Sequence, residues 1–274
     1  MNQHVPTKQN VPAAQSALCA AYGPWAVVTG ASDGIGRAFA IELARQGFSL
    51  VLVARRGAAL DDLADEVKRR FGVKALALVA DLASFAQTAR LDSETRDIDV
   101  GLIVLAAGYG GSGPFVDASQ QAELGMIDLN CRALAQSAQD FSRRFVARGR
   151  GALVLMSSLV AFQGVPRAAN YAATKAYVQT LAEGLAVELK GSGVDVLASA
   201  PGPVVSGFGA RSGMKIASGQ TPEEVARGTL RALGRRTTVR PGFLAKALEA
   251  SLSLLPRYFR VRVMAKVMAG MTGA

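Results

Sequence analysis

The glycine-rich turn after the first apolar segment limits the fold of this chain more strongly than any other feature. Residues 25–29 (WAVVT) have the composition of a buried strand, the next seven residues read GASDGIG, and apolar residues at helical spacing follow from 37 to 47. This order brings the unpaired N–H groups and positive dipole of a helix N-terminus to the end of a sheet, where they can bind a pyrophosphate. Either Ser32 or Asp33 can cap the helix. The residues predicted to hold a dinucleotide here are Gly30, Ser32, Asp33, Gly34, Ile35 and Gly36.

Strand-like and helix-like segments alternate along most of the 274 residues. This alternation predicts an α/β fold, a single-domain Rossmann-type doubly wound parallel sheet with helices on both faces and a helical C-terminal extension. We expect a flexible tail at residues 1–22, with a signal peptide as the alternative, the α/β domain at 23–240, and a basic amphipathic extension at 241–274 that packs on or near the ligand site. Further buried strands are expected at 49–54, 74–80, 99–105, 152–156 and 194–200.

The second strand ends in Arg55 and Arg56, where an acidic residue would hold the ribose 2′-hydroxyl of NAD. Two arginines favour a 2′-phosphate, so NADP (NADPH) is the expected cofactor and NAD the less favoured one. An ordinary basic helix start is the alternative. Asp81 closes the third strand, and it either faces the ligand or caps the next helix.

Ser158, Tyr171 and Lys175 bring a hydroxyl, a phenol and an ammonium into one stretch. The strand at 152–156 delivers Ser158 to the carboxyl edge of the sheet, where ligands bind in such folds. Tyr171 and Lys175 are four residues apart, so they share a helix face. A phenol has a pKa of about 10, and it becomes a useful acid or base near neutral pH only beside a cation. Taken alone, such a pair also fits an ordinary helix surface.

Histidine and cysteine usage excludes several kinds of site. The only histidine, His4, lies in the polar tail, which leaves none for a Ser-His-Asp triad or a histidine metal cluster. Cys19 and Cys131 lie far apart without metal-ligand spacing, so we expect no metal and a reducing, cytoplasmic environment. No apolar run approaches the roughly 18 residues of a membrane span.

A long helix is predicted at 120–148, and Asn130 in its interior needs a specific partner. The largely apolar helix predicted at 171–189 favours a subunit interface in a homodimer or homotetramer. Residues 207–220 have the composition of a mobile loop over a site, and Thr221 and Pro222 start the next helix.

Two helices are predicted at 243–255 and 257–271, and basic charge gathers around them. From Arg231 onward nine basic side chains accompany one acidic residue, Glu249. This charge fits a solvated face, an anionic substrate or peripheral membrane contact, whereas a nucleic-acid partner is disfavoured because interleaved aromatic residues are missing. Apolar residues such as Met264 and Met268 recur at helical spacing, which fits core packing or, alternatively, contact with a membrane or acyl chain.

These motifs occur together in the order found in short-chain dehydrogenases/reductases, and residues 24–230 resemble that family. A weaker likeness connects the chain to hydroxysteroid dehydrogenases and 3-ketoacyl reductases. The matching motifs are Thr29-Gly30-x-x-x-Gly34-Ile35-Gly36, Asp81, Asn130, Ser158, Tyr171-x-x-x-Lys175 and Pro201-Gly202.

The resemblance implies a role for each catalytic residue. Tyr171 is the general acid or base, and Lys175 lowers its pKa and binds the nicotinamide ribose. Ser158 hydrogen-bonds the substrate oxygen, and Asn130 holds a water that connects Lys175 to solvent. The resemblance also places the adenine at Asp81 and Leu82, the adenosine side at Ala107 and Gly108, and the nicotinamide at Pro201, Gly202, Val204 and Ser206.

The chain departs from the family at Leu105-Ala106, where an Asn-Asn pair is usual, so the hydrogen bonds of those amides are absent. The resulting hypothesis is an NADP(H)-dependent oxidoreductase of a ketone or secondary alcohol in a lipophilic small molecule, steroid-like or 3-oxoacyl. The alternative is a non-catalytic dinucleotide-binding sensor or interaction protein on the same fold.

Overall fold

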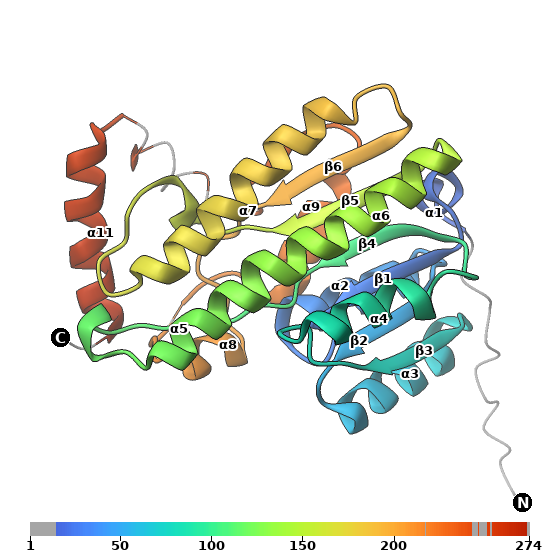
Figure 1. Cartoon of the computed structure of the whole chain (residues 1–274), viewed down its shortest axis with the longest axis horizontal. Coiled ribbons are helices and arrows are strands. Elements are labelled where there is room, and N and C mark those ends of the chain that lie inside the picture. The colour runs from blue at the N-terminus through green and yellow to red at the C-terminus, as the bar shows by residue number, and fades with distance from the viewer. Residues whose placement is uncertain (1–14, 217, 243–245, 247–250, 253, 273–274) are drawn as a thin grey trace, which may run out of the picture.

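One parallel sheet organises the molecule. The computed structural model describes residues 15–216, 218–242, 246, 251–252 and 254–272. Within them, seven strands lie in the order β3-β2-β1-β4-β5-β6-β7, which confirms the predicted doubly wound α/β fold (Figure 1). The order reverses between β1 and β4, the switch point where such sheets bind ligands. The strands are β1 (Trp25–Thr29), β2 (Ser49–Ala54), β3 (Ala75–Val79), β4 (Val100–Leu105), β5 (Gly151–Met156), β6 (Val194–Ser199) and β7 (Thr238–Val239).

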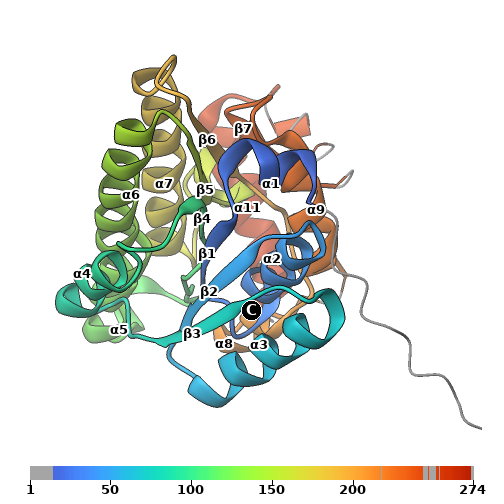
Figure 2. The ribbon, with the colours of Figure 1, turned by 90° about the vertical axis from the view of Figure 1, so that its right-hand side faces the viewer.

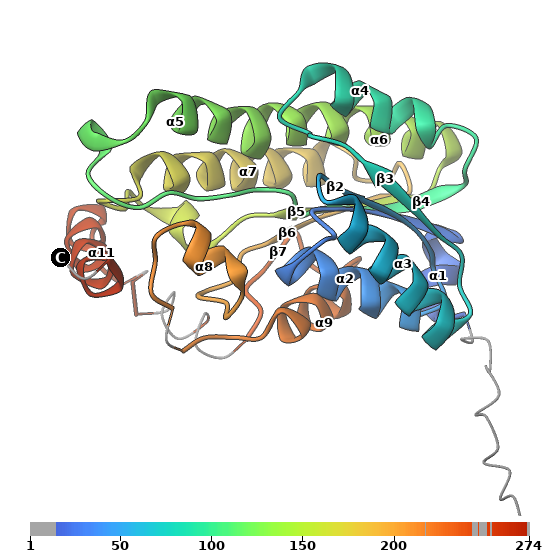
Figure 3. The ribbon, with the colours of Figure 1, turned by 90° about the horizontal axis from the view of Figure 1, so that it is seen from below.

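Helices cover both faces of the sheet (Figures 2 and 3). The central strands are apolar along their whole length because both of their faces are buried. Phe39 and Leu60 belong to the core on one face, and Phe141 and Val178 to the core on the other; all four are fully buried. One layer contains α2 (Gly34–Arg45), α3 (Gly57–Phe71) and α9 (Pro222–Ala232), and the other contains α4 (Phe85–Glu94), α6 (Leu134–Arg148) and α7 (Ala169–Glu188).

The beginning of the described chain differs from the expected tail. Residues 17–22 form α1 (Ala17–Tyr22), which Ser16 caps by accepting a hydrogen bond from the Cys19 amide. The Tyr22 hydroxyl donates to Asp195 at 2.7 Å, and Cys19 and Tyr22 are buried in the first core. This short helix therefore belongs to the folded domain, and residues 1–14 lie outside the described part of the chain.

The single long helix predicted at 120–148 is wrong, because a π-helical turn divides it. The segment contains α5 (Gln120–Ile127), the π-turn η2 (Asp128–Ala133) and α6. A π-turn is wider than an α-helical one and often occurs at functional sites. Asn130 lies on this turn.

A short helix replaces part of the loop predicted at 207–220. The Ser206 hydroxyl accepts a hydrogen bond from the Phe208 amide at 3.3 Å and caps α8 (Gly207–Arg211). The predicted start of α9 is confirmed, since Thr221 and Glu224 form a reciprocal capping box with Pro222 at the first helical position. Two 3₁₀ turns, η1 (Phe115–Asp117) and η3 (Leu159–Phe162), complete the loops at this end of the sheet.

The helix α11 (Arg257–Thr272) stands at the end of the molecule beside the start of α7 (Figures 1 and 3). The C-terminal end of α11 is fixed by a hydrogen bond from the Lys215 amide to the Met271 carbonyl, at 2.9 Å. Most of the helix predicted at 243–255 lies outside the described residues. Among the helices that the structure describes, none combines the length and apolar character needed to cross a bilayer.

Candidate active site

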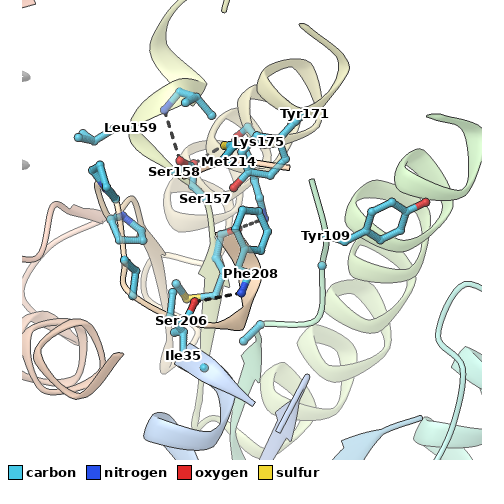
Figure 4. A pocket seen from close by; sticks show the side chains of 18 of the residues that line it. Ile35, Tyr109, Ser157, Ser158, Leu159, Tyr171, Lys175, Ser206, Phe208 and Met214 are labelled. Atoms are coloured by element: carbon cyan, nitrogen blue, oxygen red, sulfur yellow. Dashed lines mark hydrogen bonds between the residues drawn. The ribbon is translucent and has the colours of Figure 1, made fainter. Parts of the chain in front are cut away.

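One cavity of about 680 Å³ opens at the carboxyl ends of the strands. All of the predicted cofactor residues line it, together with Ser158. Figure 4 shows Ile35, Ser158, Tyr171, Lys175 and Ser206 among them. Asn130 is the one predicted site residue that does not line the cavity. The lining residues predicted from sequence are Gly30, Ser32, Asp33, Gly34, Ile35, Gly36, Arg55, Arg56, Asp81, Leu82, Ala107, Gly108, Ser158, Tyr171, Lys175, Pro201, Gly202, Val204 and Ser206.

The glycine turn forms a cradle that side chains would block. A Cβ atom on Gly36 would lie 2.2 Å from the Gly30 carbonyl oxygen, and Gly34 has a φ of +53°. The Asp33 carboxylate accepts a hydrogen bond from the Gly34 amide at 2.7 Å, so Asp33 rather than Ser32 caps α2. The turn leaves the helix N-terminus open toward the cavity, which suits an anion.

The arginines at the end of β2 lie beside this cradle. Arg56 donates to the Ser32 carbonyl and to its hydroxyl, both at 3.1 Å, and Arg55 lines the cavity next to it. Asp81 lines the same part of the cavity, and its carboxylate accepts from the Ala83 amide at 3.1 Å. Because α4 begins after Ser84, Asp81 does not cap it. The ligand-facing alternative for Asp81 therefore fits the geometry.

A threonine on β1 anchors the backbone where the family's two asparagines are missing. The Thr29 hydroxyl donates to the Val104 carbonyl at 3.3 Å and accepts from the Ala107 amide at 3.0 Å. Gly108 follows directly, and a Cβ atom there would lie 2.9 Å from Asn130 Oδ1 and 3.6 Å from Lys175 Nζ. The backbone can thus run close to Asn130 and Lys175 without the two amide side chains.

Ser157 and Ser158 leave the end of β5 and take different roles. The Ser157 hydroxyl is buried and donates to the Lys175 carbonyl at 3.2 Å, which ties β5 to α7. The Ser158 hydroxyl caps η3 by accepting from the Val160 amide at 3.4 Å, and it faces the cavity near Tyr171 and Lys175 (Figure 4). Both serines line the cavity, but the Ser157 hydroxyl is occupied by Lys175, so Ser158 is the better placed of the two to donate to a ligand.

Burial dominates the electrostatics of Tyr171 and Lys175. It raises the pKa of Tyr171 to about 12, and the Ser158 hydroxyl, which can donate to the phenolate, opposes this rise. Burial lowers the pKa of Lys175 to about 8, opposed by Cys131. The Lys175 ammonium donates to the Met156 carbonyl at 2.8 Å and lies 5.8 Å from the centre of the Tyr171 ring. Burial therefore outweighs other influences on the pKa of Tyr171 in this arrangement, and the expected lowering by Lys175 stays a prediction.

Asn130 is a fully engaged residue behind the cavity wall. It is 1% exposed, and its amide nitrogen donates to the Tyr109 carbonyl at 2.8 Å and to the Thr174 hydroxyl at 3.1 Å. Its Oδ1 accepts from the Tyr109 amide at 3.1 Å. Both N–H groups of the Asn130 side chain are therefore occupied. A water at Asn130 would have to donate a hydrogen bond to one of the oxygen atoms of this residue.

The sequence analysis placed residues 207–220 over the site but did not single out Phe208, Arg211 or Met214, which line the cavity. The Phe208 ring lies 5.6 Å from the Tyr171 ring, and Arg211 lies on the same short helix. Met214 from the following loop packs with Met268 of α11 against the start of α7. An aromatic residue in a glycine- and serine-rich segment was the available signal for Phe208. Within the residues that the structure describes, there is no group of His, Cys, Asp and Glu that could hold a metal ion.

The chain is similar to proteins of known family along most of its length. A family model described as short chain dehydrogenase matches residues 24–215. A 7beta-hydroxysteroid dehydrogenase from Clostridium sardiniense is 32% identical over 227 residues, which cover 81% of this chain and 87% of the relative.

Two solved structures share the fold. One comes from work on 7beta-hydroxysteroid dehydrogenase stereoselectivity; it has a TM-score of 0.84 and 26% identity, and the match covers 90% of this chain and 98% of that one. A short-chain dehydrogenase from Sphingobium yanoikuyae in complex with NADPH has a TM-score of 0.76 and 33% identity over 84% of this chain and 94% of that one.

Proposed function

This chain belongs to the short-chain dehydrogenase family, and we propose that it reduces a ketone on a bulky, lipophilic molecule with NADPH as the hydride donor. Family and relatives make it an oxidoreductase that binds a nicotinamide dinucleotide and interconverts ketones and secondary alcohols. One observation carries the proposal: a single cavity contains the glycine cradle, Ser158, Tyr171 and Lys175, and an apolar wall from α11.

The residues present fit a dinucleotide. A side chain at Gly36 would collide with the Gly30 carbonyl oxygen, so glycine there keeps the turn tight and lets the start of α2 face a pyrophosphate. Arg55 and Arg56 beside it would hold a 2′-phosphate, and the segment from Pro201 to Ser206 would hold the nicotinamide end. Bound there, the nicotinamide supplies the hydride that the carbonyl carbon accepts.

Tyr171 acts as the acid in this reduction. With its pKa raised to about 12, the phenol keeps its proton at neutral pH and can give it to the carbonyl oxygen as the alcohol forms. Ser158 donates a hydrogen bond to the same oxygen. Lys175, with a pKa of about 8, carries its charge at neutral pH. Its charge stabilises the phenolate form that Tyr171 takes after it has given its proton to the substrate.

An apolar wall favours a large, lipophilic substrate. Phe208, Met214, Met264 and Met268 line the cavity on the side of Tyr171. Methionine side chains adapt to irregular apolar shapes, so this wall fits a bulky ketone better than a small polar one. The sequence left open whether the methionines of α11 contact the core, an acyl chain or a membrane. Three of them, Met264, Met268 and Met271, line the cavity. The relative's name, 7beta-hydroxysteroid dehydrogenase, supports a steroid-like ketone.

NADPH depletion followed at 340 nm tests the proposal, with a bulky ketosteroid, a 3-oxoacyl thioester and a small aromatic ketone as substrates. We expect turnover of the ketosteroid, and Tyr171→Phe should bind NADPH normally but lose at least about 100-fold in kcat. Tyr177→Phe is the matched control, since Tyr177 lies on the same helix, is 43% exposed and does not line the cavity. NADPH binding without turnover of any ketone would instead support the non-catalytic sensor.

The preference for NADPH rests on the two arginines and has its own test. The double variant Arg55→Asp with Arg56→Ala should weaken NADPH binding about 10- to 100-fold and NADH binding little, because only NADPH carries the 2′-phosphate. Equal losses for both cofactors would mean that Arg56 acts only by bracing the turn at Ser32.

We also expect a homodimer or homotetramer. The outer face of α7 exposes Tyr177 and Val187, which are 43% and 73% exposed. Light scattering after size exclusion measures the assembly, and Val187→Glu should weaken it by burying an unpaired charge. A wild-type monomer at micromolar concentration would contradict this expectation.

A further inference from the structure

Asp33 places a negative charge in a cradle that is otherwise built for an anion. Its Oδ1 caps α2 through the Gly34 amide, but a neutral asparagine or serine caps a helix equally well. A carboxylate at this point repels a phosphate that approaches the same helix end. Capping therefore explains the position of the side chain and not its charge.

The second oxygen of Asp33 holds an arginine from another segment. Arg211 of α8 donates to Asp33 Oδ2 at 2.7 Å. Burial alone would raise the pKa of Asp33, but the hydrogen bonds from Arg211 and the Gly34 amide outweigh burial and lower it. The two side chains are 56% and 36% exposed, so the ion pair is weak enough to be exchanged.

The surrounding residues bring α8 close to the cradle. A Cβ atom on Gly207 would lie 2.7 Å from both Arg211 Nη1 and Asp33 Oδ2, so the pair can form only beside a glycine. Ser206 lies next to Gly34, where a Cβ atom would be 3.4 Å from the Ser206 Cβ. Arg211 also lines the cavity that contains the cradle.

The same short helix reaches the proton donor. Phe208 packs its ring 5.6 Å from the ring of Tyr171, and Figure 4 shows Phe208 between Ser206 and the group formed by Tyr171 and Lys175. The helix α8 connects the two halves of the cavity.

We propose that Arg211 binds the pyrophosphate of the dinucleotide, and that its ion pair with Asp33 keeps it beside the cradle until the dinucleotide enters. When a dinucleotide enters the cradle, the guanidinium leaves the single carboxylate for phosphate oxygens, which carry more charge and accept bidentate hydrogen bonds. The exchange keeps α8 over the cavity, with Phe208 against Tyr171. This inference rests on the dinucleotide site of the proposed function, and it concerns the pyrophosphate rather than the 2′-phosphate.

A double-mutant cycle on cofactor affinity tests the exchange, with dissociation constants measured from NADPH and NADH fluorescence. Arg211→Gln should weaken both cofactors alike, about 10-fold, because both contain the pyrophosphate. Asp33→Asn keeps the capping oxygen, removes the competitor and should tighten binding about threefold. In the Asp33→Asn background, Arg211→Gln should then cost more than in the wild type, about 20-fold, because the part of the gain that comes from relieved repulsion persists without Arg211.

A persistent structural tie predicts the opposite sign. If the Arg211–Asp33 pair stays intact in the complex, the loss from Arg211→Gln disappears in the Asp33→Asn background, and that result would overturn the proposal. An unchanged affinity in Arg211→Gln alone would do the same. Arg37→Gln is the matched control, because Arg37 lies on α2, is 43% exposed and pairs with Glu66 away from the cavity. Failure of the proposed function would differ, since wild-type protein would then bind no NADPH or reduce no ketone.

Discussion

Replacing Lys175 by methionine should make the protein more stable and inactive. Lys175 is 7% exposed, and its burial lowers the pKa from the ordinary 10.5 to about 8. At about 1.4 kcal/mol per pKa unit, this difference corresponds to a penalty of about 3 kcal/mol for keeping the charged form folded at pH 7. Lys175→Met removes this penalty but also loses the hydrogen bond to the Met156 carbonyl, which costs about 1 kcal/mol. The variant should therefore have a free energy of unfolding about 2 kcal/mol higher than the wild type.

The pH dependence has a defined sign. Between pH 8 and 10.5 the unfolded chain holds the Lys175 proton and the folded one releases it, so stability increases with pH in this window. The penalty is fully present below pH 8 and shrinks by about 2 kcal/mol up to pH 10. Above pH 10 the raised pKa of Tyr171 reverses the trend, because the folded state then keeps a proton that the unfolded state loses.

Urea unfolding of wild type and Lys175→Met at pH 7, 8, 9 and 10, followed by circular dichroism, measures this difference. Other titrating groups contribute nearly equally to both proteins, so the difference between them isolates Lys175. We expect the advantage of the variant to decrease from about 2 kcal/mol at pH 7 to about zero at pH 10. A difference that stays constant over this range would refute a lowered pKa for Lys175.

Substitutions at three further positions test the packing in and around the site, each by urea unfolding. Gly36→Ala would put its Cβ 2.2 Å from the Gly30 oxygen and should destabilise by about 1–3 kcal/mol while abolishing NADPH binding; unchanged binding would contradict the cradle geometry. Gly184→Ala lies inside α7 with nothing within 4 Å, so it should stabilise by about 1 kcal/mol, and a loss of stability would show a contact there. Thr174→Val leaves a buried N–H of Asn130 without its partner and should cost about 1–3 kcal/mol, whereas Thr174→Ser should cost less; equal costs would remove the hydroxyl from the argument.

Local patterns predicted the elements whose structure depends on neighbouring residues. The apolar run before Gly30 forms β1, the glycine spacing gives the cradle, and the capping box at Thr221 starts α9. These features depend on backbone sterics and on hydrogen bonds within a few residues. Period and spacing record such constraints directly.

The structure differs from the sequence predictions where contacts between distant parts of the chain shape the backbone. The π-turn around Asn130 accompanies hydrogen bonds to Tyr109 and Thr174, which are 21 and 44 residues away in the chain. The helix α1 is held by Tyr22 on Asp195, 173 residues later. No helical periodicity within the segment itself contains this information.

The amino-acid sequence by itself determined the α/β fold and the glycine turn, and it predicted a site at Ser158, Tyr171 and Lys175, because each depends on a motif whose residues are close in the chain or end neighbouring strands. Only the tertiary structure decided the environment of those residues. Burial dominates the pKa values of Tyr171 and Lys175, and Met214 packs with Met268 beside the cavity because separate segments converge there. Desolvation and packing depend on what surrounds a side chain from every direction, and a linear motif specifies only its neighbours along the chain.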